Sequence, residues 1–285
     1  MHEVRTELPY AGAFASGSVL GHLVATSTPG VEEWRDGAYR RTVALPGGPG
    51  IVSLTVLPGR VRARFWLTAA DDEPEAVRRC RRLLDLDADL AVVDGVLGRD
   101  PLLGPLVVAS PGRRLPGTTD PCELALKVVL GQQVSTAAAR TLAARLAVGH
   151  GTPVDDPDGG LTRLFPSPQV IARIDPAELA MPRRRAETVV RLAGLLADGS
   201  VRLTDVADAR AQLSGVAGIG PWTIEIVAMR GLGDPDAYPA GDLGVRKALA
   251  RLPGAAPETW KPWRSYATQH LWAALDHEIN RLPAP

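Results

Sequence analysis

The stretch LSGVAGIGPWTIEIVAMRGLGDPDAYPAGDLGVRK, residues 213–247, decides the fold class of this 285-residue chain. Its pattern predicts a short helix that ends at Leu213, a Gly-rich hairpin over 215–220 and a second helix that begins at Pro221. The glycines permit a tight turn and a close approach of the backbone to another surface. The first amides of the second helix lack intrahelical partners, and the helix dipole favours an anion there. The stretch therefore predicts a helical hairpin that binds a phosphate through its backbone.

The overall charge of the chain excludes binding of nucleic acid through a general positive surface charge. Lysine and arginine number 32, and aspartate and glutamate also number 32, so the formal net charge at pH 7 is zero. No general positive field surrounds such a protein, and phosphate binding has to come from local patches or oriented backbone amides.

Two cysteines, Cys80 and Cys122, are too few for a disulfide scaffold, a four-thiolate zinc site or an iron–sulfur cluster. No apolar run approaches the ~20 residues of a membrane helix, and the first residues lack the pattern of a secretory leader. We therefore expect a soluble, reduced protein of the cytoplasm that uses no cofactor.

Residues 1–92 have the pattern of an antiparallel sheet. Three runs rich in β-branched residues are separated by Gly/Pro turns: 40–46, 51–57 and 61–68. Apolar and polar residues alternate in the third run, which is typical of a half-buried strand in a meander. A helix is expected at about 73–85, with Asp72 as its N-cap and Glu75 as the capping-box partner.

From residue 93 onward, helix signals replace strand alternation. Asp120, Pro121 and Glu123 predict a helix start with a capping box, and this helix breaks at Gly131. Two further starts are expected at Ser135, for a helix over 136–148 that Gly149 closes, and at Pro182, for a helix that ends near 198.

These patterns predict an α+β fold. We expect an antiparallel-sheet N-terminal domain over 1–92 and a mostly α-helical body over 93–285. The body contains the helix–hairpin–helix motif at about 207–230 and a Gly/Pro-rich loop over 231–242.

The segment 213–247 holds more than a Gly-rich turn, which alone is as compatible with an ordinary connection between helices. An amphipathic helix, a Gly/Pro-rich loop and Asp242 follow the VAGIG hairpin. This wider pattern resembles the helix–hairpin–helix DNA glycosylase superfamily. The segments RLPGTTDPCELALKVVLGQQVS (114–135) and WKPWRSYATQHLW (260–272) are similar to the DNA-3-methyladenine glycosylase II family, the AlkA type, which also carries a β-rich N-terminal domain. The likeness covers nearly the whole chain.

The resemblance implies that Asp242 is the catalytic residue. Cleavage of the bond between a purine nitrogen and the sugar C1′ passes through an oxocarbenium-like transition state. A carboxylate near C1′ stabilises that charge and orients the attacking water. Asp242 is also positioned to cap a helix over 243–250, and it can serve both purposes. Asp234 and Asp236 precede it and are interpreted as turn residues.

The resemblance also implies a pocket for an extruded base. Trp222 and Trp272 match the family's pocket tryptophans, whose faces attract a cationic alkylated purine by roughly 0.5–2 kcal/mol. Core packing is the other explanation for either side chain. Trp222 stands where lyase-type relatives carry a Schiff-base lysine, so we expect attack by water. Four other positions that are aromatic in well-known members carry different residues here: His22, Ile226, Leu243 and Ala273. The range of lesions that the pocket accepts is therefore left open.

Contacts to DNA are expected from two turns. The family uses the position of Gln133 as an apolar wedge into the gap left by the base, and a glutamine can fill that gap and hydrogen-bond there. Gln132 is equally compatible with a structural role. The residues expected at the DNA are Gln132, Gln133, Gly218, Ile219, Gly220 and Thr223. The carbonyls of Ser214, Val216 and Gly218 are placed to hold a structural monovalent cation that bridges to phosphate.

Three further groups have simpler interpretations. The helix expected after Pro182 carries four arginines near its start: Arg183, Arg184, Arg185 and Arg191. These side chains either contact the DNA backbone or form a solvated helix face. His270 and His277 have no carboxylate pair at metal-ligand spacing, so we expect no metal site there. Trp260, Trp263 and Tyr266 are interpreted as packing for the last helix.

The resemblance implies a monofunctional DNA glycosylase of base excision repair. We expect a monomer, associated with the nucleoid, that acts on double-stranded DNA with alkylated purines such as 3-methyladenine and 7-methylguanine. Two other hypotheses remain: a non-catalytic DNA-binding or damage-sensing protein, and a glycosylase tuned to neutral lesions such as hypoxanthine. Asp242 together with Trp222 and Trp272 favours the enzyme, because a phosphate clamp needs none of them.

Overall fold

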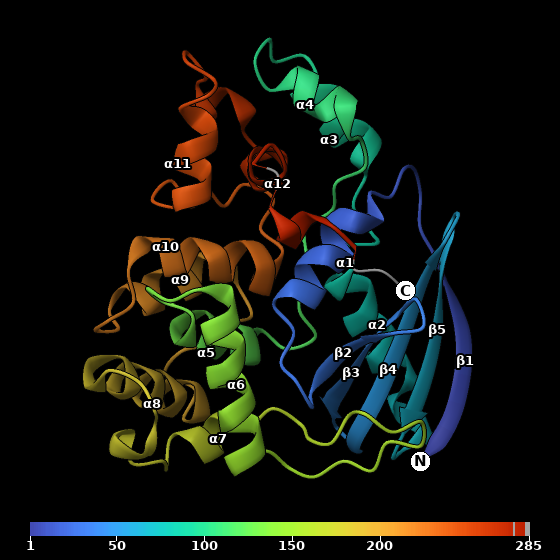
Figure 1. Ribbon diagram of the computed structural model, residues 1–285, viewed down its shortest axis with the longest axis vertical. Helices are drawn as coiled ribbons and strands as arrows, with labels where there is room; N and C mark the ends of the chain where they lie inside the picture. The colour runs from blue at the N-terminus through green and yellow to red at the C-terminus, as the bar shows by residue number, and fades with distance from the viewer. Residues whose placement is uncertain (276, 283–285) are drawn as a thin grey trace.

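The amino-terminal part of the chain folds into one antiparallel sheet (Figure 1). The computed structural model describes residues 1–275 and 277–282. The strand order is β1-β5-β4-β3-β2. The strands are β1 His2–Pro9, β2 Glu32–Arg35, β3 Ala38–Leu45, β4 Gly48–Leu57 and β5 Arg60–Leu67. The predicted alternation is confirmed, because Val52 and Phe65 face the core beneath helices α1 (Ser16–Ala25) and α2 (Glu73–Leu83), whereas Ile51 and Trp66 contact a loop on the other face.

Three elements of this sheet domain were not predicted: β1, β2 and α1. The two strands lie at the edges of the sheet, where charged residues such as Glu3 and Arg5 mask the apolar pattern. Helix α1 contains two glycines, which lower its intrinsic helix propensity. It forms because Val19, Leu20 and Leu23 are buried against the sheet.

Two of the predicted capping boxes are wrong in part. The carboxylate of Asp72 makes no cap bond to α2 and instead accepts from the backbone N–H of Gly47. Asp120 caps its helix as predicted, at 2.7 Å from the N–H of Cys122. Glu123, however, turns away from the cap and pairs with Arg41 of β3 at 2.7 Å. In both cases a partner distant in sequence replaces the local one.

Helices make up the rest of the chain, as predicted. Their bounds are α3 Leu90–Leu97, α4 Gly104–Ala109, α5 Pro121–Leu130, α6 Thr136–His150, α7 Pro168–Ile171, α8 Arg183–Ala197, α9 Val206–Ser214, α10 Pro221–Ile226, α11 Leu243–Leu249 and α12 Arg264–Ala273. Ser135 caps α6 as predicted, but α6 continues through Gly149 and ends before Gly151. Helix α10 passes into a π turn over Val227–Gly231. No helix of the described residues is long and apolar enough to cross a membrane.

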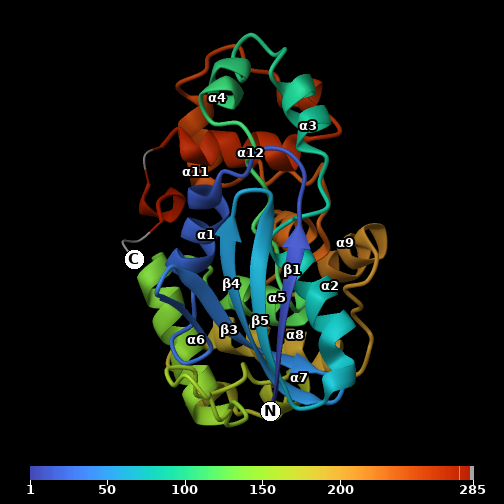
Figure 2. The ribbon, with the colours of Figure 1, turned by 90° about the vertical axis from the view of Figure 1, so that its right-hand side faces the viewer.

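The buried side chains form three main groups, and a cleft lies where they meet. One group joins the sheet to α1 and α2. A second joins α5, α6, α8 and α9, and a third joins α3 and α4 to α11 and α12. Figure 2 looks onto the sheet, with α3, α4 and α12 above its upper end and α5 and α8 behind it. Helices from all three groups therefore surround the space between the sheet domain and the helical body.

Candidate active site

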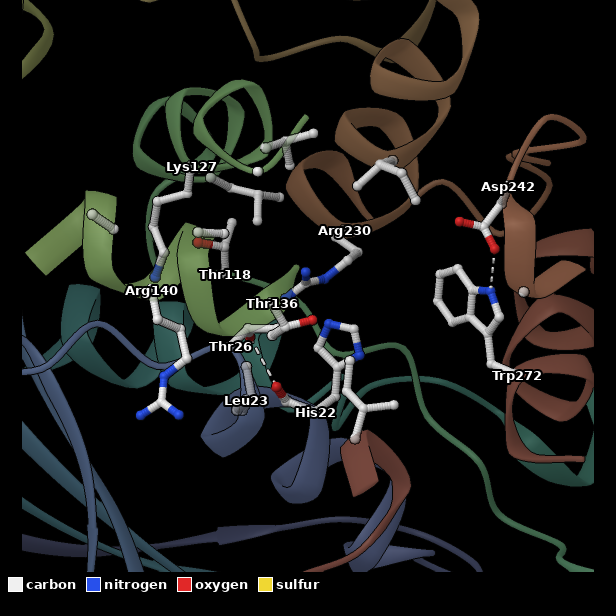
Figure 3. Close-up of a pocket in the computed structure, with 18 of the residues that line it drawn as sticks. His22, Leu23, Thr26, Thr118, Lys127, Thr136, Arg140, Arg230, Asp242 and Trp272 are labelled. Atoms are coloured by element: carbon white, nitrogen blue, oxygen red, sulfur yellow. Dashed lines mark hydrogen bonds between the residues drawn. The ribbon is translucent and has the colours of Figure 1, made fainter. Parts of the chain in front are cut away.

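A cleft of about 550 Å³ opens between the sheet domain and the helical body. Side chains of α1, α5, α6, α10, α11 and α12 line it. Figure 3 shows its two ends: Asp242 and Trp272 lie at one, and Lys127 and Arg140 lie at the other. A cleft of this size can enclose a nucleobase together with part of its sugar.

The carboxylate of Asp242 accepts hydrogen bonds from two indole N–H groups, and no other carboxylate of the cleft does so among the described residues. Trp222 Nε1 donates to Oδ2 at 3.0 Å, and Trp272 Nε1 donates to Oδ1 at 2.8 Å. Oδ1 also accepts the backbone N–H of Val245 at 3.0 Å, so the predicted N-cap of α11 is confirmed. Three donors fix the orientation of the carboxylate, and Oδ2, which accepts only one of these hydrogen bonds, can accept another.

The two tryptophans belong to an apolar group that forms the wall beside Asp242. Both are half-buried, and they pack against Leu124, Val128 and Ile226. Sequence reasoning identified both tryptophans and Ile226 but missed the two α5 residues, which carry no signal beyond ordinary helical periodicity. The indole N–H edges point at Asp242. The sequence predicted the indoles in the pocket without predicting this arrangement.

His22 and Arg230 form the next section of the wall (Figure 3). The imidazole of His22 lies stacked on Trp272, with ring centroids 6.3 Å apart. Only 8% of His22 is exposed, and its Nε2 has no hydrogen-bond partner among the described residues. Burial, reinforced by the Arg230 charge, holds the pKa of His22 well below its ordinary value, so the imidazole is neutral. Leu243 differs from the other predicted pocket residues, because it lies at the mouth and is 64% exposed.

The hairpin between α9 and α10 has the predicted tight geometry. Gly218 has φ of +92°, a backbone conformation that favours glycine, and it lies directly over Thr188 of α8. The N–H of Ile219 donates to the carbonyl of Val216 at 3.0 Å and closes the turn. Gly220 precedes α10 and provides the first helical carbonyl acceptor, for Ile224.

The two glutamines of the neighbouring turn have different surroundings. Gln132 donates from Nε2 to the Gly218 carbonyl at 3.2 Å and to Thr223 Oγ1 at 3.0 Å. Its amide therefore joins the α5–α6 turn to the hairpin. Thr223 as a whole residue is 2% exposed, so neither its side chain nor its backbone is available to a phosphate, and it serves as the buried partner of Gln132. Gln133 is exposed, with φ of +57°.

Two family descriptions match this chain. Residues 5–120 match the AlkA N-terminal domain, and residues 126–273 match the HhH-GPD superfamily of base excision DNA repair proteins. DNA-3-methyladenine glycosylase 2 of Escherichia coli K12 is 35% identical over 289 residues, which are 95% of this chain and 96% of that protein. The chain belongs to the HhH-GPD superfamily.

Two further similarities extend the comparison. A probable bifunctional transcriptional activator/DNA repair enzyme AlkA of Mycobacterium tuberculosis H37Rv is 50% identical over 291 residues. The match covers 98% of this chain but 59% of that relative's length. The 3-methyladenine DNA-glycosylase from Archaeoglobus fulgidus has a TM-score of 0.77 at 22% identity, over 94% of this chain and 97% of that chain. This likeness confirms the fold predicted from the sequence.

Two arginines hold the loop that carries Asp242 in this HhH-GPD chain. Arg210 of α9 pairs with Glu225 at 2.9 Å and with Asp234 at 2.7 Å. Arg264 of α12 pairs with Asp236 at 2.7 Å. Asp236 also donates its N–H to Asp234 Oδ1 at 2.9 Å, so the turn interpretation of the two aspartates is confirmed. Their pairing with arginines was not predicted, because it depends on Arg210 of α9 and Arg264 of α12, each of which lies more than 20 residues from its partner in the sequence.

A network of four charged side chains lies at the other end of the cleft, and sequence reasoning missed it. Arg41 contacts Glu32 at 3.2 Å and Glu123 at 2.7 Å, and Lys127 contacts Glu32 at 2.6 Å. The phenol of Tyr39 donates to Glu32 at 2.8 Å. Burial alone would raise the pKa of Glu32, but the charges of Lys127 and Arg41, together with hydrogen bonds from the Lys127 ammonium and the Thr28 N–H, lower it to about 2. The network joins β2 and β3 of the sheet domain to α5 of the helical body.

The remaining predicted residues lie outside the cleft or at its edge. Trp260 is 1% exposed and Tyr266 is 5% exposed within the third core, so their packing role is confirmed. His270 is 1% exposed, and burial lowers its pKa to about 3. His277 is exposed and accepts the N–H of Ile279. In the part of the chain that the structure describes, no group of three His, Cys, Asp or Glu side chains is arranged to hold a metal ion.

We expect the substitution Gly218→Ala to destabilise the hairpin by about 1–3 kcal/mol. An L-residue rarely adopts φ of +92°, and the added Cβ would overlap Thr188 Oγ1. Thermal unfolding measures this loss. Gly215→Ala is the matched control in the same hairpin, because Gly215 has helical backbone angles and its added Cβ would meet only Gln212 O, at 3.6 Å. Equal melting temperatures for the two variants would contradict the tight turn.

Proposed function

We propose that this chain is a monofunctional DNA glycosylase of base excision repair that releases alkylated purines and leaves an abasic site. The observation that carries the proposal is the Asp242 carboxylate, held by Trp222 and Trp272 at the wall of a base-sized cleft. The names of the Escherichia coli and Mycobacterium tuberculosis relatives support the same activity.

The proposed reaction begins with extrusion of the lesion into the cleft, with C1′ of its sugar near Asp242 Oδ2. The bond between C1′ and the purine nitrogen breaks, and its electron pair leaves with the base. A cationic alkylated purine leaves as a neutral molecule and needs no proton. The carboxylate stabilises the positive sugar, and a water adds to C1′ and loses a proton to the carboxylate or to solvent.

Trp222 supports hydrolysis by water over attack by an amine. No lysine occupies position 222, and the indole there is committed to Asp242. Of the lysines that line the cleft, Lys127 is paired with Glu32, and Lys247 is exposed on α11. We therefore propose that no Schiff base forms with the sugar.

We propose that the DNA lies across the two turns beside the cleft. Gln133, exposed and in a positive-φ conformation, would fill the gap left by the base. The backbone amides of Gly218 and Gly220 would contact a phosphate, with Gln132 bracing the hairpin from behind. Ile219 and Thr223 would shape this contact from within, because the Ile219 N–H is used in the turn and Thr223 is buried. The carbonyl oxygens of Ser214, Val216 and Gly218 are of the kind that binds a monovalent cation. Those of Val216 and Gly218 each accept one hydrogen bond and keep a second lone pair for such an ion.

Three coarser features complete the proposal. We propose a domain boundary near residue 92, because residues 90–115 contribute to the core of α11 and α12 and the sheet core ends at Leu86. We also propose that the protein acts as a monomer on double-stranded DNA. Its place would be the cytoplasm, in association with the nucleoid.

A second candidate is a glycosylase tuned to neutral lesions such as hypoxanthine. The observation that favours it is the wall beside Asp242, where Ile226, Leu124 and Val128 are aliphatic, together with the neutral His22 in the next section of the wall. Such a wall offers little cation–π attraction beyond the two indoles. The positive Arg230 beside His22 also favours a neutral base over a cationic one.

Chromatographic identification of the bases released from methylated and from deaminated DNA tests both candidates. The first requires release of 3-methyladenine and 7-methylguanine, and the second requires faster release of hypoxanthine. The abasic strand should break only after alkali, and borohydride should trap no covalent complex with the protein. Absence of any released base would leave only the non-catalytic DNA-binding hypothesis, and a trapped complex would contradict monofunctional hydrolysis.

A further inference from the structure

The chain has two arginine-rich helices, and they use their charge differently. On α2, Arg78 and Arg79 pair with Glu75 and Arg81 pairs with Asp87. The fourth α2 arginine, Arg82, donates to the carbonyls of residues 118 and 119. The charge of α2 is therefore used within the sheet domain and its neighbouring segment.

On α8, only one of the four arginines has a carboxylate partner among the described residues. Arg183 pairs with Glu187 at 2.8 Å, one turn away. The guanidinium groups of Arg184 and Arg185 make no hydrogen bond or ion pair within residues 1–275 and 277–282. Arg191 is exposed and donates from Nη1 to the carbonyl of Ala217 at 3.2 Å, which leaves its charge uncompensated. Helix α8 thus carries an excess positive charge on a chain whose net charge is zero.

The same helix packs under the hairpin. Thr188, near the middle of α8, lies against Gly218 at the turn. Arg184 precedes Thr188 by four residues and Arg191 follows it by three, so helical spacing places both on the face of α8 that meets the hairpin. Along the axis they are separated by about 10 Å, which is comparable to the rise of three nucleotides of one strand. In Figure 1, α8 lies below α9 and α10 on the left of the view.

We propose that Arg184 and Arg191 bind DNA backbone phosphates on either side of the phosphate at the hairpin, so that α8 extends the DNA interface. The inference rests on the proposed function, because it takes the hairpin as a DNA contact. Exposed guanidinium groups without carboxylate partners are suited to phosphate oxygens, which they bind in a bidentate manner. Each contact releases condensed counterions from the DNA, and this supplies affinity that a neutral protein otherwise lacks.

The test is the salt dependence of binding by the double variant Arg184→Gln/Arg191→Gln. Glutamine at 191 removes the charge and keeps an amide donor on a shorter side chain. The probe is a short DNA duplex with one abasic-site analogue, titrated between about 50 and 200 mM salt. We expect the slope of log affinity against log salt to fall by about 1 for each arginine removed, and the affinity at the lowest salt to fall about tenfold.

The matched controls are Arg183→Gln on the same helix and Arg78→Gln on α2, whose charges have carboxylate partners. Both should bind with the wild-type slope, and all variants should unfold at the wild-type temperature. An unchanged slope for the double variant would overturn the proposal and make α8 a solvated face. If the wild-type chain excises bases but the double variant keeps its slope, only this inference fails. If the wild type neither binds the duplex nor releases a base, the proposed function fails with it.

Discussion

Replacing Asp242 with asparagine is expected to reduce base release by about 10³-fold or more while DNA binding persists. The amide carries no charge, so it cannot stabilise a positive sugar as the carboxylate does. Asparagine caps helices as well as aspartate, and its oxygen at the Oδ1 position still accepts from Val245 and Trp272. Its NH₂ group then faces the Trp222 N–H, so one hydrogen bond is lost while the fold is retained.

Single-turnover release of 7-methylguanine measures the effect, and anisotropy with an abasic-site duplex measures binding. Asp205→Asn provides the control, because Asp205 caps α9 through the N–H of Asp208 in the same way but lies outside the cleft. The control should release base at the wild-type rate. Release at that rate by the Asp242 variant would instead reduce Asp242 to a helix cap and remove the basis of the proposed function.

Short-range chemistry explains what could be predicted. The caps at Asp120, Ser135 and Asp242 each depend on a side chain and an amide within three residues, so the sequence contains the whole interaction. The hairpin at Gly218 depends likewise on a local backbone conformation. Such features can be predicted before any tertiary contact is known.

Contacts between distant segments explain what was missed. Glycines in α1 argue against a helix, yet Gly21 is required because an added Cβ would lie 2.7 Å from the backbone of Arg281. That contact joins two ends of the chain, and α1 carries His22 into the cleft. The sequence also pointed to Asp242 and the two tryptophans separately. It could not indicate that both indole N–H groups meet the carboxylate, because this depends on how α10, α11 and α12 converge.

Replacing Arg41 with methionine is expected to lower the free energy of unfolding by about 3–5 kcal/mol. Arg41 is 2% exposed and contacts both Glu32 and Glu123, so its removal leaves two buried carboxylates with Lys127 as the nearest cation. For a chain of this size the melting temperature should fall by roughly 10 °C. Arg60→Met is the control, because the Arg60–Glu7 pair is exposed and such pairs contribute about 1 kcal/mol or less.

The pH dependence separates this network from a simple loss of packing. In the wild type, the pKa of Glu32 is lowered to about 2, so its stabilising contribution is complete above its ordinary pKa and is lost as the pH falls toward 2. Burial raises the pKa of Glu123, and Arg41 opposes that shift. Without Arg41 the folded state favours protonated Glu123, so the variant loses stability as the pH rises through the raised pKa. Unfolding by urea at pH 5 and pH 8 should therefore show a larger deficit at pH 8, and an equal deficit at both values would mean that the guanidinium contributes through packing alone.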